Sequence, residues 1–189
     1  AAFHGRPGFR VVVLYPDGRV SPRQAHQLRW FGDNIHTYRV QGSFDDCQRM
    51  VKAAFSDPAL RAAIPLSSAN SISLGRLLPQ MSYYAQAALA HRRRHATPLN
   101  FIVPTGNLGN AVAALMARAI GLPIGTVALA CNGNRTLADF LAGAEYAPRA
   151  SIATLANAMD VGAPSNIERL RWLYPDAAAL RAAVPAASF

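Results

Sequence analysis

Lysine is nearly absent from this chain. Lys and Arg together number 19 in 189 residues, and Lys52 is the single lysine among them. A reaction that needs a lysine amine must therefore use Lys52 or a residue outside this sequence. Residues 50–55 around it are typical of an ordinary helix, so the sequence does not favour Lys52 as a reactive amine.

Cysteine is scarce as well, and long apolar runs are missing. Cys47 and Cys131 form no CxxC pair and no Cys/His ligand spacing, which argues strongly against a structural zinc site. Two distant cysteines favour the free thiols of a reduced, cytoplasmic protein. No run of about 18 apolar residues is free of charge, so we expect no membrane partner. Residues 1–8 have no apolar signal region and lead almost directly into a strand without an initiator Met, so we expect a cut inside a domain.

Acidic residues are few beside the arginines. Asp and Glu number 10, which leaves a formal net charge of +9. The one dense basic run, residues 91–95, lies at the predicted end of a helix, where cations complement the helix dipole. No RNP, zinc-finger or helix-turn-helix pattern accompanies this run, so we expect a solvated helix end and no nucleic-acid partner.

Apolar runs and turn signals alternate along the chain. Strands are expected at residues 11–15, 35–40, 100–104 and 126–131. Helices are expected at residues 22–31, 44–55, 71–91, 110–120, 136–141 and 165–174, with Pro79 bending or breaking the longest. Ser21, Ser43, Thr136 and Ser165 are the expected caps. This order predicts an α/β fold, an open, mostly parallel twisted sheet with helices on both faces. We divide it into an α/β domain at residues 1–143 and a loop- and helix-rich extension of the same domain at residues 144–189.

A glycine-containing loop at residues 105–110 joins the third strand to an alanine-rich helix. Ligands of open α/β sheets bind at the carboxyl ends of strands, and a loop that opens a helix exposes backbone N–H groups beside the positive end of the dipole. Gly106 and Gly109 permit a tight backbone, and Asn107 and Asn110 can add side-chain donors. The loop therefore fits a phosphate cradle, with a plain tight turn as the alternative.

Small polar residues crowd residues 67–73, just before the longest predicted helix. A helix cap is a sufficient reason for some of them. Arg76 follows within about two turns of helix, and together they could hold an anion. A cap alone and an anion site both remain open here.

Residues 131–134 and 159–169 are weaker candidates. The first follows the fourth strand and is either a turn or part of the same cleft as Gly106, and the second contains a loop and a capping box from Ser165 to Glu168. No nucleophile constellation or metal-ligand cluster is visible, because the five histidines lie outside these loops.

Six motifs follow one another along nearly the whole chain in the order found in one enzyme family. They are VLYP with GRVS at residues 13–21, SSANSI at 67–72, PTGNLGN at 104–110, GLPI at 121–124, ACNGN at 130–134, and AMDV with PSNIER at 158–169. Each is weak alone, but together they resemble the threonine synthases, most of all the longer bacterial- and yeast-like branch.

The resemblance implies the large domain of a fold-type II enzyme that uses pyridoxal 5′-phosphate (PLP). The family's loop for the cofactor phosphate matches Gly106, Asn107, Leu108, Gly109 and Asn110, with Leu108 where Phe is usual. An apolar residue is kept there, so we expect the backbone amides to be unaffected.

The family's binding segment for the substrate phosphate matches Asn70, Ser71 and Arg76, and Ser73 stands where Asn is common. The family's Schiff-base lysine and its substrate loop are expected upstream of residue 1. No catalytic residue is therefore expected in this chain, and Lys52 matches no motif for that lysine. We expect the chain to be inactive alone and to need the remainder of its own polypeptide.

The activity implied by the resemblance is that of a PLP-dependent carbon–oxygen lyase acting on phosphates. It converts O-phospho-L-homoserine and water to L-threonine and phosphate. The alternative is a non-catalytic phosphometabolite-binding module with the same fold.

Overall fold

The computed structural model describes residues 2–188, and the chain divides into two compact units, Ala1–Leu66 and Ser67–Phe189. Each unit has its own parallel sheet, with two strands in the first and three in the second. The α/β class and the parallel pairing are confirmed, whereas the strands form two sheets and not one. The expected division at residues 143 and 144 stays a prediction.

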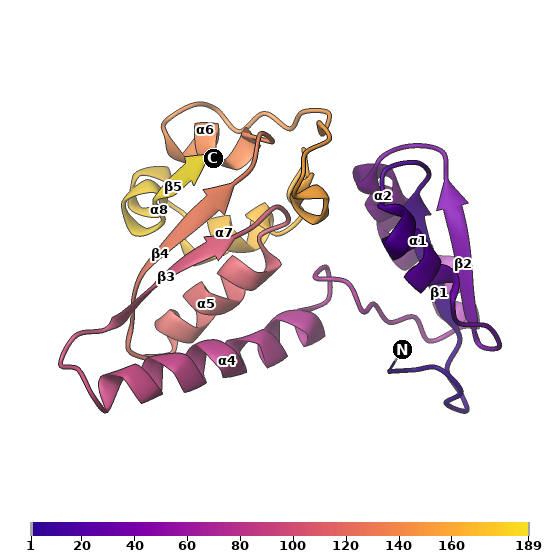
Figure 1. Cartoon of the computed structure of the whole chain (residues 1–189), viewed down its shortest axis with the longest axis horizontal. Helices are drawn as coiled ribbons and strands as arrows, with labels where there is room; N and C mark the ends of the chain where they lie inside the picture. The colour runs from indigo at the N-terminus through magenta and orange to yellow at the C-terminus, as the bar shows by residue number, and fades with distance from the viewer. Residues whose placement is uncertain (1, 189) are drawn as a thin grey trace. The chain divides into compact units, whose positions relative to one another are not determined.

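The first unit is built on strands β1 and β2, which pair in parallel from Val11 opposite Ile35 to Pro16 opposite Val40. Helix α2 packs on β1 (Figure 1). The helices begin at side-chain caps from Ser21, Ser43 and Asp57, of which the last was not expected. The elements are β1 (Val11–Pro16), α1 (Pro22–Arg29), β2 (Ile35–Val40), α2 (Phe44–Ser56) and α3 (Pro58–Ala63).

The second unit holds the sheet β3–β4–β5, whose strands all run parallel. Figure 1 shows α4 and α5 side by side beneath β3 and β4. The elements are α4 (Leu74–Arg92), β3 (Leu99–Pro104), α5 (Gly109–Ala119), β4 (Ile124–Cys131), α6 (Thr136–Leu141), the 3₁₀ turn η1 (Asn157–Met159), α7 (Ile167–Leu173), α8 (Ala177–Ala183) and β5 (Ala186–Ser188).

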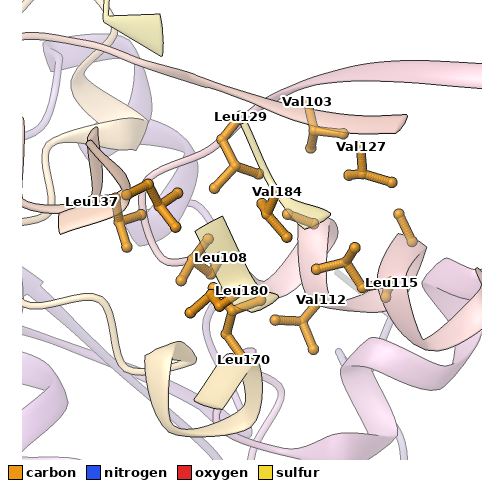
Figure 2. Packing of buried hydrophobic residues seen from close by; sticks show 14 of the residues in the cluster. Val103, Leu108, Val112, Leu115, Val127, Leu129, Leu137, Leu170, Leu180 and Val184 are labelled. Carbon is orange, nitrogen blue, oxygen red and sulfur yellow. The ribbon is translucent and has the colours of Figure 1, made fainter. Parts of the chain in front are cut away.

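The core of the second unit lies around α5, which is buried along most of its length. Its alanines carry no bulk beyond Cβ, so α4 and the sheet approach its backbone closely. Figure 2 shows Val112 and Leu115 of α5 among leucines and valines of the strands and of α7 and α8. Leu170, Leu180 and Val184 tie the carboxyl-terminal part of the chain into this core.

Several local expectations are corrected. Pro79 lies inside α4 without ending it, and α4 begins at Leu74 because Ser73 caps it. Thr136 does not cap α6, because its hydroxyl donates to the Gly162 carbonyl 3.0 Å away. Ser165 does not cap α7 either, since its side chain bonds elsewhere. On β3, the Ile102 side chain is 77% exposed within this chain.

A hydrogen-bonded carboxylate at the start of α2 makes the stability of the first unit depend on pH in the acid range. The Ser43 backbone N–H and hydroxyl both donate to the Asp46 carboxylate, and Arg49 pairs with it at 2.6 Å. These contacts, led by the backbone hydrogen bond, lower the pKa of Asp46 from 3.8 to about 2. A carboxylate with a lowered pKa stabilises the fold above its unfolded pKa, and this effect is lost as pH falls through the folded value.

We therefore predict that Asp46→Asn lowers the melting temperature of α2 and its unit at neutral pH. The deficit relative to wild type should shrink as pH falls from about 5 to about 2, because the wild-type carboxylate becomes protonated. The difference in melting temperature is measured by thermal unfolding across this pH range, with circular dichroism as the signal. A deficit that is constant with pH would contradict the assigned role of the charge.

Candidate functional site

The loops after β3 and β4 start at the same edge of the sheet, as the sequence predicts. Pro104 pairs with Ala130 in the parallel register, and the Thr105 backbone N–H donates to the Ala130 carbonyl at 3.0 Å. The loop at residues 105–110 therefore begins at the carboxyl end of β3 and leads directly into α5. This is the position at which open α/β sheets bind ligands.

Thr105 and Asn110 shape this loop from within. The buried Thr105 hydroxyl donates to Asn110 Oδ1 at 2.9 Å and accepts from the Leu108 N–H at 3.1 Å. Asn110 Nδ2 donates back to the Pro104 carbonyl at 2.9 Å. Asn110 thus holds the loop to β3. This arrangement does not favour the expected role of its side chain as a donor to a ligand.

Leu108 adopts a left-handed backbone conformation, with φ 65° and ψ −4°. Such a conformation costs a non-glycine residue about 1–2 kcal/mol. The Leu108 side chain is fully buried in the hydrophobic core (Figure 2), which offsets that cost. The left-handed residue turns the chain sharply into the first turn of α5.

The loop leaves a set of backbone donors open. Among the described residues, the backbone N–H groups of Gly106, Asn107, Gly109 and Asn110 have no hydrogen-bond acceptor, whereas the N–H groups of Leu108 and Ala111 do. These open amides also lie at the positive end of the dipole of α5, a helix of 11 residues. The loop can therefore bind a phosphate group through its backbone alone.

The Asn107 side chain joins three segments of the second unit. Its Nδ2 donates to Ser71 Oγ at 2.8 Å, and its Oδ1 accepts from the Ser165 N–H at 2.6 Å and from Ser165 Oγ at 2.9 Å. The sequence suggested this side chain as a donor to a ligand. The structure instead uses it to hold the loop between residues 67–73 and the start of α7.

Ser71 is the counterpart of Asn107 in the neighbouring segment. Its hydroxyl donates to Asn70 Oδ1 at 3.2 Å and accepts from the amides of Asn107 and Asn166. A hydroxyl has one donor and two acceptor positions, so this one is fully used. A Cβ on Gly109 would lie 2.7 Å from Ser71 Cβ, so this contact requires glycine at the start of α5.

Asn166 and Arg169 complete this junction, and the sequence indicated them only as members of the weaker candidate segment at residues 159–169. Asn166 is fully buried, and its Nδ2 also donates to the Asn107 carbonyl at 2.9 Å. The Arg169 guanidinium donates to the Ser71 carbonyl at 3.2 Å, to the Ile72 carbonyl at 2.5 Å and to Asn166 Oδ1. The sequence signals were the PSNIER motif and the capping box from Ser165 to Glu168, and a capping box is equally typical of a helix start.

Arg76 and Asn70 present the open donors of the second candidate segment. Arg76 is exposed in the first turn of α4, and its guanidinium has no partner among the described residues. Asn70 Oδ1 accepts from Ser71 Oγ and the Ile72 N–H, which leaves its Nδ2 without an acceptor in the part of the chain that the structure describes. Ser73 caps α4 by accepting from the Gly75 N–H at 3.2 Å, which settles the cap role for that residue.

The other candidate segment after a strand, residues 131–134, is hydrogen-bonded to a neighbouring loop. Asn132 and Asn134 turn toward residues 149–162 and bond to them. Cys131 ends β4 as a buried free thiol whose pKa is raised by burial. Within residues 2–188, no three His, Cys, Asp or Glu side chains come together as metal ligands.

No protein-family model matches the chain. Curated relatives do: the chain is 43% identical over 173 residues to the threonine synthase of Serratia marcescens, covering 92% of the chain and 40% of that protein. The corresponding enzyme of Saccharomyces cerevisiae is 39% identical over 171 residues, covering 89% of the chain and 33% of that protein. The chain is homologous to part of threonine synthase.

Solved threonine synthases share the fold. The Escherichia coli structure superposes with a TM-score of 0.88 at 38% identity, over 99% of this chain and 44% of that one. A PLP-bound threonine synthase from Brucella melitensis gives 0.77 at 33% identity, over 99% and 46%. The α/β architecture of fold-type II PLP enzymes is thereby confirmed. The chain spans 40% of the length of the Serratia marcescens relative and 33% of the Saccharomyces cerevisiae one.

We predict that Asn166→Ala destabilises the second unit by about 2 kcal/mol, because it strips partners from Ser71, Asn107 and Arg169 in a buried place. Urea unfolding measures the loss. The control is Gln86→Ala on the exposed face of α4, which should stay within about 0.5 kcal/mol of wild type. Equal stability of the two variants would show that the junction carries little energy.

Proposed function

We propose that the polypeptide containing this chain is a threonine synthase, which uses PLP to convert O-phospho-L-homoserine and water to L-threonine and phosphate. The observation that carries the proposal is the set of four open backbone amides at the start of α5, in a segment homologous to threonine synthases. They form a donor set suited to a phosphate group.

The cofactor phosphate is assigned to Gly106, Asn107, Leu108, Gly109 and Asn110. Gly106, Asn107, Gly109 and Asn110 contribute mainly through their backbone N–H groups, because the Asn107 and Asn110 side chains already hold the loop in shape and the Leu108 N–H donates to Thr105 Oγ1. The left-handed Leu108 brings the flanking N–H groups to one end of α5. When bound, PLP supplies an electron sink for the chemistry at the amino acid.

The substrate phosphate is assigned to Asn70, Ser71 and Arg76. Arg76 offers a guanidinium without a partner among the described residues, and Asn70 Nδ2 adds a neutral donor. Because the Ser71 hydroxyl is fully used, we assign its backbone N–H to the anion; that N–H has no acceptor within residues 2–188. Ser71 therefore positions one phosphate site through its side chain and serves the other through its backbone.

The reactive lysine is assigned to a part of the polypeptide outside residues 1–189. Lys52 lies exposed on α2 in the first unit, and the sequence around it matches no motif for that lysine. We therefore propose that residues 1–189 alone bind phosphate groups without turnover. The same fact supports the second candidate, a phosphometabolite-binding module without catalysis.

The remaining partners and the place of action belong to the same proposal. No described helix is both long and apolar enough to span a bilayer. We propose a cytoplasmic enzyme of a small phosphorylated substrate, completed by the remainder of its own polypeptide and without nucleic-acid or membrane partners.

We predict that Arg76→Ala in the complete polypeptide raises the KM for O-phospho-L-homoserine by about 10- to 100-fold, because a charge-assisted contact to phosphate is lost. Affinity for PLP should be unchanged. Released inorganic phosphate is the assay, and Arg93→Ala at the far end of α4 is the matched control with wild-type KM. Wild-type protein that binds PLP and releases no phosphate would leave the binding module as the function.

A further inference from the structure

Residues 149–162 form a loop whose two ends meet. The Arg149 N–H donates to the Gly162 carbonyl at 3.2 Å, and a Cβ on Gly162 would lie 1.8 Å from the Arg149 carbonyl oxygen. Arg149 Nη1 also pairs with Asp139 of α6 at 2.8 Å. The loop is therefore closed at its base and fixed to the body of the second unit.

The Asp160 carboxylate organises the inside of this loop. It accepts from Asn132 Nδ2 at 2.8 Å, Asn134 Nδ2 at 3.1 Å, Thr154 Oγ1 at 2.7 Å and the Thr154 N–H at 2.9 Å. None of the five ion pairs found among residues 2–188 includes Asp160. Four neutral donors thus hold one carboxylate, an arrangement that no side chain without two acceptor oxygens reproduces.

The same hydrogen bonds attach the loop to the end of β4. Asn132 and Asn134 follow β4 directly, so Asp160 is bound to the sheet through them. Asn134 also pairs with both backbone groups of Ile152, accepting from its N–H at 2.8 Å and donating to its carbonyl at 3.0 Å. The loop and the end of β4 form one rigid polar unit.

The residue next to Asp160 presses against the proposed cofactor loop. A Cβ on Gly106 would lie 2.6 Å from the Met159 carbonyl oxygen and 2.9 Å from Met159 Cα. The backbone of Met159 therefore forms a wall against Gly106, the first of the four residues with open amides. Any movement of Met159 changes the space in which Gly106 and Asn107 are held.

We propose that Asp160 is a positioning residue for the cofactor phosphate: through Asn132, Asn134 and Thr154 it fixes the Met159 backbone against Gly106 and so keeps the open amides of the loop in place. The inference rests on the proposed function and adds to it a residue that does not itself touch the phosphate.

The test compares two ligands that differ only in the phosphate group. Dissociation constants of PLP and of pyridoxal are measured by absorbance and fluorescence titration of the complete apo-protein. Asp160→Asn keeps the shape but presents an amide NH₂ to groups that also donate, so the affinity for PLP should fall by about tenfold or more. The affinity for pyridoxal should change by less than about twofold, because pyridoxal lacks the phosphate group that the loop at residues 105–110 binds.

Asp176→Asn is the matched control. Asp176 caps α8 in the same unit by accepting from two backbone N–H groups, and asparagine caps helices equally well. Its ratio of pyridoxal to PLP dissociation constants should equal that of wild type. Thr154→Val serves as a milder variant, which removes the hydroxyl while keeping the backbone N–H to Asp160. It should lower the ratio in the same direction by a smaller factor.

The outcomes separate the two proposals. A ratio that falls in Asp160→Asn and Thr154→Val, and not in Asp176→Asn, supports the positioning role. An unchanged ratio overturns the positioning role while the proposed function stands. This holds whether neither affinity falls or both affinities fall by the same factor. Wild-type protein with no preference for PLP over pyridoxal overturns the proposed function and the positioning role together.

Discussion

The hydrogen bond from the Asn107 side chain to the Ser71 hydroxyl, 2.8 Å long, connects the two segments to which both phosphate sites are assigned. The fully buried Asn166 amide bonds to both partners, to Ser71 Oγ at 3.2 Å and to the Asn107 carbonyl at 2.9 Å. A partly buried network of this kind is rigid when all its members are satisfied and costly when one is removed. Here Ser71 Oγ and Asn107 Oδ1 both have hydrogen-bond partners, so side chains determine how the two segments lie relative to each other.

A division of labour follows from this junction. The side chains of Thr105, Asn107 and Asn110 hold the loop in shape, and its backbone is left to meet the ligand. Backbone donors fixed by side chains need no rearrangement when an anion arrives, which favours binding. Leu108 contributes through strain, since its left-handed backbone is maintained by the burial of its side chain in the core.

The sequence predicted those features that depend on local pattern. Strand β2 agrees at both ends, α2 begins at the expected Ser43 cap, and the loops after β3 and β4 meet at one edge of the sheet. The threonine synthase resemblance and the α/β class are confirmed by the relatives and by the solved structures. These expectations rested on capping chemistry, apolar runs and motifs, all of which are readable over a few residues.

Features that depend on contacts between distant residues were missed. Asn166 and Arg169 bond to residues 95 to 98 positions away, and nothing local distinguishes them from a helix cap and its first turn. Ser165 fits a capping box by sequence, yet its hydroxyl is taken by Asn107, 58 residues away. The short helices α3 and α8 were not expected, although Asp57 and Asp176 cap them, whereas the equally short α6 was expected at its observed bounds.

The central claim is that backbone N–H groups within residues 106–110 bind the phosphate of PLP, while the side chains of this loop only hold those N–H groups in place. A crystal structure of the complete polypeptide with PLP tests it most directly. We predict phosphate oxygens within about 3 Å of the backbone nitrogens of Gly106, Asn107, Gly109 and Asn110, with the Asn107 side chain still bonded to Ser71. A phosphate bound elsewhere, or held by an Asn107 side chain released from Ser71, would contradict the account.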